Sequence, residues 1–489
     1  MSFCVITVFP QNRKLTVPVG TNLLSALRQA GLHADAPCGG HGTCGKCKVL
    51  IDGQAVLACQ TTVDRDMTVA LPEVGEAVIL TSGLSVATHP DGENAYALAF
   101  DIGTTSVVCY LLDGHTGNLI AQASCLNPQT RFGGDVISRL QHVLQNNSDA
   151  LQASIREALA DLTIETAQAA GISPEAITVA AIAGNTAMHH LLLGIDPKPL
   201  TTPPYMPAVS EAMELPAHKL LPISPTGTVR MLPNIAGFVG GDTAGCLTAV
   251  RFDRMDKLTL MLDIGTNGEM VLGDKHGFLA CSSAAGPAFE GAKISCGMRG
   301  AAGAVDHVYL ENGQVRYHVI DDAPPMGLCG SGLLDLTAVL LETEEITGTG
   351  RMPCKEYPLG DSSVVLTQQD VRELQLAKGA IRAGIELMCE HLGRRVEEID
   401  TVLLAGAFGN YLNPASACRI GMIPPCLESK IRPIGNAAGV GAQLCALSRA
   451  EFDYTKDLAA KAQFLELASL PQFQDRFVDA LSLEEDEDD

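Results

Sequence analysis

Four cysteines near the N-terminus have the spacing of an iron–sulfur ligand set. Cys38, Cys44 and Cys47 form a C-x5-C-x2-C run, and Cys59 follows twelve positions later. Plant-type [2Fe–2S] proteins use a similar C-x4-C-x2-C…C pattern, whose first gap is one residue shorter. Glycines 39, 40, 42 and 45 let the backbone wrap closely and direct N–H groups at the sulfides. We therefore expect these four thiolates to hold a [2Fe–2S] cluster.

Structural zinc is the main alternative for the same cysteines. Zinc sites usually pair two C-x2-C knuckles, and this chain has one near its N-terminus. Cys4 lies outside the ligand spacing and is interpreted as a core residue. The other eleven of the sixteen cysteines, Cys281, Cys296 and Cys329 among them, show no ligand spacing. They are interpreted as small apolar core side chains.

A second kind of chemistry is indicated by the tetrapeptide Asp-Ile-Gly-Thr, which occurs at residues 101–104 and again at 263–266. Each copy ends a strand-like segment and turns back into another. Such a hairpin can bind phosphate through its glycine, its N–H groups and its hydroxyls, and its aspartate can hold Mg²⁺. Two hairpins closing on one nucleotide are a much stronger indication than one. The expected residues are the catalytic Asp101 and Asp263 and the nucleotide-binding Gly103, Thr104, Thr105, Gly265, Thr266 and Asn267.

A third segment, residues 403–410, is a buried strand that breaks into a glycine turn. This turn suits an adenosine lying against the backbone, although an ordinary strand-to-helix turn has the same pattern. Its expected nucleotide contacts are Gly406, Ala407, Phe408 and Gly409. Asp242 is the third expected catalytic residue, because it could position Mg²⁺ or the attacking water; helix capping is an equally good interpretation. Glu290 is interpreted as a cleft residue or a surface charge.

The elements around the cysteines follow a β-grasp pattern. Alternating residues 3–8 and 14–19 predict a hairpin, and Thr21 is expected to cap a short helix that ends at Gly31. Strands are predicted at residues 48–51 and 67–71. Further along the chain, the small residues in segments 237–245 and 435–441 predict two helices that cross closely, as a hinge between two lobes requires.

Composition narrows the class of protein. A formal charge of −23 disfavours nucleic acid and anionic membranes as partners. No apolar run reaches the roughly 18 residues of a membrane span, and the N-terminus lacks the basic flank of a signal peptide. We therefore expect a cytoplasmic protein whose cysteines are not paired in disulfides. The chain has no G-x-x-x-x-G-K-[ST] loop, so it is not a P-loop enzyme.

The three nucleotide motifs and the two small-residue segments resemble those of the superfamily of actin, hexokinase and acetate kinase. The resemblance implies an α+β β-grasp ferredoxin domain followed by a two-lobed α/β actin-like (ribonuclease H-like) ATPase. The duplicated tetrapeptide agrees with two similar lobes. The expected divisions are a ferredoxin domain at 1–73, a linker at 74–94, lobe I at 95–255, lobe II at 256–450 with its final helix returning towards lobe I, and a C-terminal helix with an acidic tail at 451–489.

A ferredoxin domain fused to such an ATPase resembles the reductive activators of corrinoid proteins. The resemblance covers nearly the whole chain and includes residues 127–129, 132–138, 184–188, 285–291, 296–300 and 327–335. It implies ATP-dependent one-electron reduction of an inactive Co(II) corrinoid protein to Co(I), in support of cobalamin-dependent methyl transfer. Plant-type clusters lie near roughly −400 mV, and the cobalt couple lies lower, so the transfer is uphill and must be driven.

The resemblance also implies the cofactors and partners. The cofactors are a [2Fe–2S] cluster, ATP and Mg²⁺. The partners are a corrinoid protein of a methyltransferase system and a low-potential electron donor such as a reduced ferredoxin or a flavoprotein, with no nucleic acid and no membrane. A homodimer is a family-level expectation only. Longer family members carry an extra small domain after the ferredoxin, whereas about 20 residues connect the two parts here.

Three other functions are compatible with parts of the sequence. The ATPase could activate another low-potential enzyme, although such activators hold a [4Fe–4S] cluster between two subunits and lack a ferredoxin domain. It could be a small-molecule kinase, which would phosphorylate an acceptor. It could also be an ATP-gated redox sensor, which would bind nucleotide but transfer no electrons to an acceptor.

Overall fold

The structure is a computed structural model that describes residues 2–32, 36, 40, 42, 45–71, 81 and 83–484. Cys38, Cys44, most of residues 72–82 and the acidic end of the chain lie outside the described residues. Among the described residues, no helix combines the length and apolar character that a membrane crossing requires.

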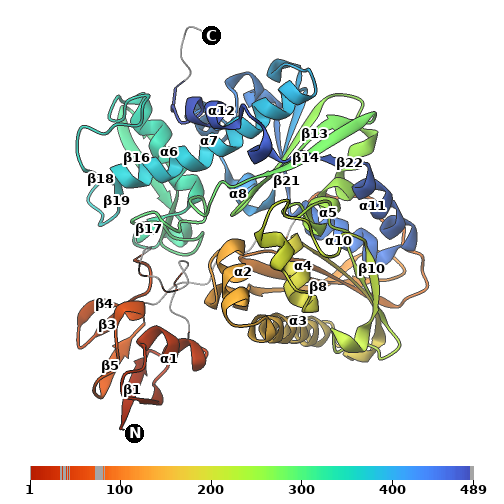
Figure 1. The fold of residues 1–489 in the computed structure, drawn as a ribbon, viewed down its shortest axis with the longest axis horizontal. Coiled ribbons are helices and arrows are strands. Elements are labelled where there is room, and N and C mark those ends of the chain that lie inside the picture. The colour runs from red at the N-terminus through yellow and green to blue at the C-terminus, as the bar shows by residue number, and fades with distance from the viewer. Residues whose placement is uncertain are drawn as a thin grey trace.

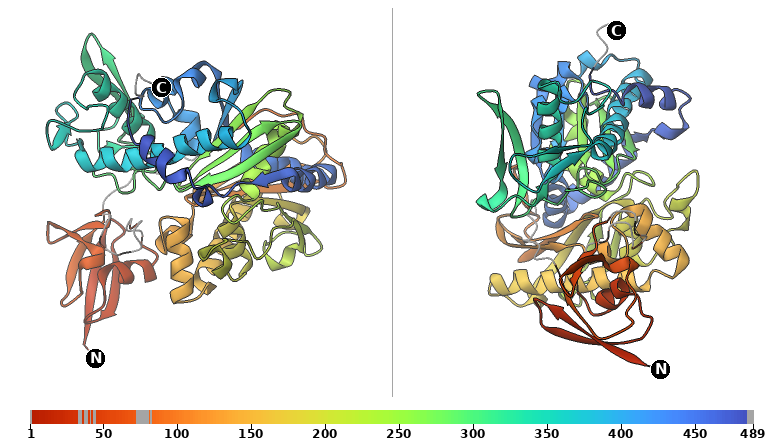
Figure 2. Two further views of the ribbon diagram at one scale, coloured as in Figure 1. Left: turned by 45° about the horizontal axis from the view of Figure 1, so that its top comes forward. Right: turned by 90° about the vertical axis from the view of Figure 1, so that its left-hand side faces the viewer.

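The N-terminal domain is a β-grasp, as the alternating sequence predicted. A five-stranded sheet in the order β2-β1-β5-β3-β4 is covered by one helix. Its elements are β1 (Phe3–Phe9), β2 (Arg13–Pro18), α1 (Leu23–Gln29), β3 (Lys48–Ile51), β4 (Gln54–Leu57) and β5 (Met67–Ala70). Ile6 and Val8 of β1 and Leu23 and Leu27 of α1 are completely buried against one another. This domain lies at one end of the molecule, beside the two larger lobes (Figures 1 and 2).

One detail of this domain differs from the expectation. Asn22, not Thr21, caps α1: its side-chain oxygen accepts a hydrogen bond from the N–H of Ser25 at 3.2 Å. Thr21 lies one residue too early and donates its hydroxyl to the carbonyl of Pro18 at 2.7 Å. Both residue types can cap a helix, so the sequence alone does not fix the first helical turn to one residue.

The main sheets of the two lobes, which Figure 1 shows facing each other, share five strands in the same order, β11-β9-β6-β7-β8 and β21-β20-β12-β13-β14, and the sixth strand is added at opposite edges. The shared five strands confirm the predicted internal duplication. In lobe I, β6 pairs with β7 antiparallel and with β9 parallel; in lobe II, β12 pairs in the same way with β13 and β20. The lobe I elements are β6 (Tyr96–Ile102), β7 (Ser106–Asp113), β8 (Leu119–Leu126), α2 (Val136–Gln145), α3 (Asp149–Ala169), β9 (Ile177–Gly184), α4 (Thr186–Leu193), β10 (Met213–Pro216) and β11 (Thr228–Met231).

Lobe II adds two small sheets and several helices to its main sheet. The strands of the main sheet are β12 (Thr259–Ile264), β13 (Gly268–Asp274), β14 (Gly277–Ser283), β20 (Thr401–Ala405), β21 (Ile431–Gly435) and β22 (Ala462–Phe464). The small sheets contain β15 (Ala304–Glu311), β16 (Gln314–Val319), β17 (Gly327–Leu328), β18 (Glu356–Pro358) and β19 (Val365–Thr367). The helices are α6 (Gly330–Glu342), α7 (Gln368–His391), α8 (Gly406–Tyr411), α9 (Pro414–Arg419) and α12 (Phe473–Asp479).

Two helices of small residues, α5 (Gly241–Val250) and α10 (Ala437–Leu447), cross between the lobes, and α11 (Arg449–Lys461) follows them. Their backbones approach so closely that a Cβ atom on Gly441 would lie 2.1 Å from the carbonyl oxygen of Gly245. Ala442 and Cys445 of α10 share one core with Ala97 of β6 in lobe I. Each lobe therefore contributes one helix to this close crossing.

The chain that leaves the β-grasp domain rejoins the fold at this crossing. Gly83 forms an isolated antiparallel bridge with Gly435, and the carbonyl of Thr81 accepts a hydrogen bond from the Tyr110 hydroxyl at 2.9 Å. Leu84 and Val86 pack against the core that contains α5 and α10. The described part of the expected linker therefore lies on the lobes, at the end of β21 and the start of α10.

The close crossing yields a stability prediction. Gly441→Ala places a methyl group against the backbone of Gly245, so we expect the free energy of unfolding to fall by about 1–3 kcal/mol, despite the better helix propensity of alanine. Chemical denaturation measures the change. Gly277→Ala is the matched control, because a Cβ atom there meets nothing within 4 Å. Equal stability of the two variants would contradict the close crossing.

Candidate active site

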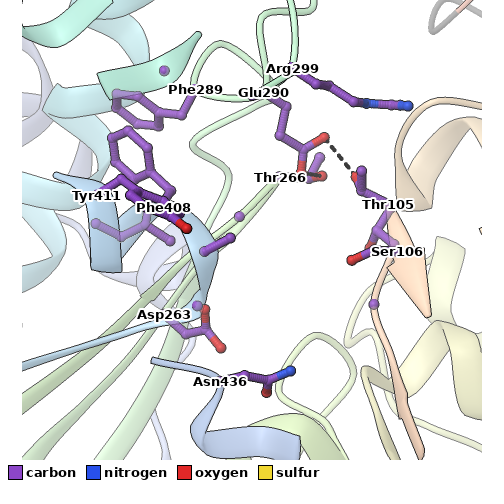
Figure 3. Close-up of a pocket in the computed structure, with 18 of the residues that line it drawn as sticks. Thr105, Ser106, Asp263, Thr266, Phe289, Glu290, Arg299, Phe408, Tyr411 and Asn436 are labelled. Atoms are coloured by element: carbon purple, nitrogen blue, oxygen red, sulfur yellow. Dashed lines mark hydrogen bonds between the residues drawn. The ribbon is translucent and has the colours of Figure 1, made fainter. Parts of the chain in front are cut away.

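A cavity of about 590 Å³ lies between the two lobes, and the residues of all three sequence motifs meet in it (Figure 3). Asp101, Gly103, Thr104, Thr105, Asp242, Asp263, Gly265, Thr266, Asn267, Gly406, Ala407 and Phe408 line it. Gly409 does not: it faces β20, where an added Cβ would lie 3.1 Å from the Cβ of Leu404. The expectation that Gly409 contacts the nucleotide therefore has no support in the geometry.

The two phosphate hairpins are built alike. The N–H of Gly103 donates to the carbonyl of Ser106, and the N–H of Gly265 donates to the carbonyl of Asn267, both at 2.9 Å. Each hairpin leaves an aspartate at the end of its first strand and hydroxyl side chains at its tip. The two tips belong to different lobes and face each other across the cavity (Figure 3). A group that contacts both tips would therefore join the lobes.

Glu290 is such a group. One of its carboxylate oxygens accepts a hydrogen bond from the Thr105 hydroxyl at 3.0 Å, and the other accepts one from the Thr266 hydroxyl at 2.7 Å (Figure 3). The carboxylate thus occupies the donors that the sequence assigned to phosphate. Of the two interpretations of Glu290, the cleft residue is correct and the surface charge is wrong.

Four half-buried carboxylates form the floor of the cavity. Burial raises the pKa of Asp101 to about 7, and the neighbouring Asp242 adds to this effect. Burial and repulsion from Asp242 and Asp101 likewise raise the pKa of Asp263 to about 7. Burial raises the pKa of Asp242 to about 6, although the N–H of Thr243 opposes it. The pKa of Glu269 is also raised well above its usual range, mainly by burial.

This donor set suits a divalent cation that arrives with a nucleotide. Nearby positive charge would lower the pKa values of these carboxylates and remove their mutual repulsion. Within the described part of the chain, no three His, Cys, Asp or Glu side chains form a preassembled metal site. Mg²⁺ commonly takes one or two carboxylates and completes its shell with phosphate oxygens and water. The residues present therefore fit Mg²⁺ bound together with a nucleotide.

One wall of the cavity is aromatic. The rings of Phe289 and Phe408 stack with centroids 4.6 Å apart, and Tyr411 lies beside them (Figure 3). Gly406 adopts φ +79°, and a Cβ atom there would lie 2.6 Å from a carboxylate oxygen of Asp263. Only glycine fits this turn without strain. The predicted adenosine turn therefore brings a flat apolar surface next to the aspartates.

Three positioning residues were not predicted. Asn436 donates its amide to Asp101 at 2.8 Å and also caps α10 by accepting from the N–H of Gly439. Asn185 donates to the Thr104 hydroxyl at 3.0 Å. Arg139, fully buried, donates to the backbone carbonyl of Thr104 at 2.5 Å. The sequence signals for Asn185 and Asn436 were their places immediately before helices and within the segments 184–188 and 435–441.

The described part of the iron–sulfur loop is consistent with a ligand cradle. Cys47 is buried, and its carbonyl accepts a hydrogen bond from the N–H of Ala58 at 2.8 Å, which holds it next to Cys59. Gly40, with φ +100°, approaches so closely that a Cβ there would lie 3.8 Å from the Cβ of Cys59. Gly42 and Gly45 also have positive φ. The glycine-rich loop therefore turns towards Cys47 and Cys59, which fits a cluster at this place.

Most of the other cysteines are core residues. Cys4 and Cys281 are buried as expected, and Cys296 is half-buried. Cys329 is buried in the core of lobe II but also borders the central cavity. Cys354 and Cys426 are exposed, so the interpretation of all eleven remaining cysteines as core was wrong for these two.

Comparison with known proteins matches each part of the chain. The model of the 2Fe-2S iron-sulfur cluster binding domain matches residues 6–69, that of the RACo middle region matches residues 96–255, and that of the C-terminal domain of RACo, the ASKHA domain, matches residues 257–489.

Individual relatives agree with these matches. The chain is 37% identical over 414 residues to the corrinoid activation enzyme RamQ of Eubacterium limosum. The aligned region covers 78% of this chain and 69% of that protein. It is 28% identical to the [Co(II) methylated amine-specific corrinoid protein] reductase of Methanosarcina barkeri over 51% of this chain and 50% of that protein. A solved structure of a reductive activator for corrinoid, iron-sulfur protein superimposes with a TM-score of 0.74 and 29% identity over 98% of each chain.

The raised pKa of Asp263 predicts a pH dependence of stability. The folded protein keeps a proton on this carboxyl from its ordinary pKa of 3.8 up to about 7, where the unfolded chain has lost it. The wild type therefore loses stability as pH rises through this range. Asp263→Asn stays neutral, so its free energy of unfolding should rise relative to the wild type, by about 1 kcal/mol or more between pH of about 4 and about 7.

Urea unfolding of the protein without nucleotide or Mg²⁺ measures this difference. Asp457→Asn removes an exposed carboxylate on α11 and is the matched control. A difference between Asp263→Asn and the wild type that stays constant with pH would contradict the buried, proton-retaining carboxyl.

Proposed function

This chain belongs to the family of corrinoid activation enzymes, and on that premise we propose that it reduces the Co(II) form of a corrinoid protein to Co(I) in an ATP-dependent one-electron reaction. The observation that carries the proposal is the meeting of both phosphate hairpins at one carboxylate, that of Glu290, which also borders a small cavity lined by Lys46 of the β-grasp domain. A cleft of this kind binds nucleotide between two lobes, and an iron–sulfur domain beside it can carry the electron.

The proposed reaction uses two sites of the chain, the cysteine loop and the cleft between the lobes. We propose that Cys38, Cys44, Cys47 and Cys59 hold a [2Fe–2S] cluster and that the cleft holds Mg-ATP. When bound, the cluster supplies a one-electron carrier, and the nucleotide supplies the free energy for an uphill transfer. Cys47 is buried, which keeps bulk water away from one side of the site, and solvent exposure is one of the factors that set the reduction potential of a cluster.

In the cleft, the hydroxyls of Thr105 and Thr266 donate to phosphate oxygens once Glu290 has moved away. Asp101, held by Asn436, and Asp263 lie near the ends of the first strands of the two hairpins, where they would hold Mg²⁺. Asp242 lies in the first turn of α5 and lines the same cavity, so it orients the attacking water. Hydrolysis can drive electron transfer only if the nucleotide states differ in affinity for the partner.

The adenosine lies along Gly406, Ala407 and Phe408, against the stacked rings of Phe289 and Phe408. The further parts of the proposal rest on the family. They are a corrinoid protein of a methyltransferase system as electron acceptor, a low-potential donor such as a reduced ferredoxin or flavoprotein, a cytoplasmic location and a homodimer.

Anaerobic spectroscopy tests the proposal. Reconstituted protein is mixed with a low-potential donor and a Co(II) corrinoid protein, and the visible spectrum of Co(I) is followed with and without Mg-ATP. We expect Co(I) to form only with Mg-ATP, and to form about 100-fold more slowly or not at all in Cys47→Ser and in Asp263→Ala. Cys354→Ser and Asp457→Ala, which change exposed residues of the same types, are the controls.

Two results would contradict the proposal. One is Co(I) formation at the same rate without nucleotide, because the cleft would then have no part in the reaction. The other is ATP-dependent phosphorylation of a small acceptor without any change at cobalt, which would identify a kinase.

A further inference from the structure

Lys46, in the described part of the iron–sulfur loop, joins this loop to lobe II. Lys46 lies between Cys44 and Cys47, and its ammonium donates hydrogen bonds to the carbonyl of Ile294 at 2.5 Å and to the carbonyl of Gly297 at 2.7 Å. The carbonyl of Ser295 lies 3.5 Å away. Three carbonyl oxygens of one loop thus surround a single ammonium group, which is an arrangement that recognises positive charge.

The shape of loop 290–299, which accepts the hydrogen bonds of Lys46, is determined by its glycines and by hydrogen bonds to the rest of lobe II. Gly291 has φ +73°, and a Cβ on Gly297 would lie 2.3 Å from the carbonyl oxygen of Gly291. The loop is also tied down from outside: the N–H of Ser295 donates to Asp370 at 2.7 Å, and the N–H of Met298 donates to Leu328 at 2.8 Å. Its carbonyls therefore form a receptor whose shape depends on the body of lobe II and not on Lys46.

The same loop begins at the nucleotide cleft. Glu290, which accepts from both phosphate hairpins, is the residue before the left-handed Gly291 and lies four positions before Ile294. A small cavity of about 30 Å³ is bordered by Lys46, Glu290, Gly297 and Arg299 together. A displacement of Glu290 therefore acts at the cavity edge that also holds the ammonium of Lys46.

A nucleotide has to displace Glu290. Its terminal phosphate and this carboxylate are both negative and would compete for the same hydroxyls of Thr105 and Thr266, so they cannot occupy those donors together. Glycine at position 291 gives the backbone the freedom to swing the carboxylate away. Such a swing would alter the turn at Gly291, and with it the placement of the Ile294 and Gly297 carbonyls that Lys46 contacts.

We propose that Lys46 and loop 290–299 form a nucleotide-controlled latch for the iron–sulfur domain. With Glu290 on the two hairpins, the loop holds Lys46 and keeps the domain docked on lobe II. Phosphate on the hairpins releases the latch and frees the domain to approach the corrinoid protein. This regulation rests on the proposed function, since it presumes that the cleft binds ATP and that the domain delivers electrons.

Reciprocal coupling makes the latch measurable without any electron transfer. If phosphate binding weakens the latch, then loss of the latch must strengthen nucleotide binding by the same factor. Lys46→Met keeps the aliphatic stem and removes the charge. We expect the cluster-loaded full-length variant to bind a non-hydrolysable Mg-ATP analogue about fivefold more tightly or better, by calorimetry.

Lys48→Met is the matched control, because Lys48 is exposed on β3 two positions away, and it should bind the analogue like the wild type. Glu290→Gln supplies the second arm. A neutral amide does not repel phosphate, so the effect of Lys46→Met on affinity should shrink to less than about twofold in the Glu290→Gln background. Unchanged affinity in Lys46→Met, or an equal effect in both backgrounds, would overturn the latch.

Small-angle X-ray scattering supplies a readout of the domain itself. The analogue should increase the radius of gyration of the wild type, and Lys46→Met should show the larger value before any nucleotide is added. A wild-type radius that is the same with and without the analogue would overturn the proposal. ATP-dependent Co(I) formation alongside that result would leave the proposed function standing and reject only the latch.

Discussion

The two hydrogen bonds that Thr105 and Thr266 donate to Glu290 are the interaction on which the rest of the structure depends. They join the tips of two hairpins that belong to separate sheets, so the lobes must approach across a narrow cleft. That approach is possible because α5 and α10 cross with no side chain between Gly441 and Gly245. The duplicated sheets place the hairpins, and the small-residue helices determine how far apart they lie.

The charged forms of the cleft carboxylates are disfavoured when no cation is bound. Burial and mutual repulsion raise the pKa values of Asp101, Asp242 and Asp263, because three carboxylates converge where water is scarce. In the proposed function, a divalent cation would relieve this repulsion, and a phosphate would replace Glu290 at the hydroxyl donors. Binding of Mg-nucleotide would then change both the charge balance of the cleft and the position of the loop that begins at Glu290. In the proposed latch, this gives nucleotide binding a mechanical consequence at the iron–sulfur domain.

Much of this could be predicted from the sequence, because the informative patterns are local. Strand alternation predicted the β-grasp sheet, and the repeated Asp-Ile-Gly-Thr predicted the duplicated lobes and the residues at their hairpins. Contacts between distant residues were not predictable in this way. Asn436 and Asp101 are 335 positions apart, and Lys46 and Ile294 are 248 positions apart. Thr21 and Asn22 are neighbours that can both cap a helix, so the sequence pattern did not choose between them. Gly409 was expected to contact the nucleotide because it belongs to the same short segment as Gly406 and Phe408.

A single-turnover experiment tests the proposed ATP-dependent electron transfer most directly. Protein with a pre-reduced cluster, freed of excess donor, is mixed rapidly with a Co(II) corrinoid protein, and the cluster and cobalt absorption bands are recorded together. We expect cluster oxidation and Co(I) formation to follow one time course with equal amplitudes, and we expect both to require Mg-ATP in the cleft. Cluster oxidation by the corrinoid protein at the same rate and extent without nucleotide would contradict this expectation.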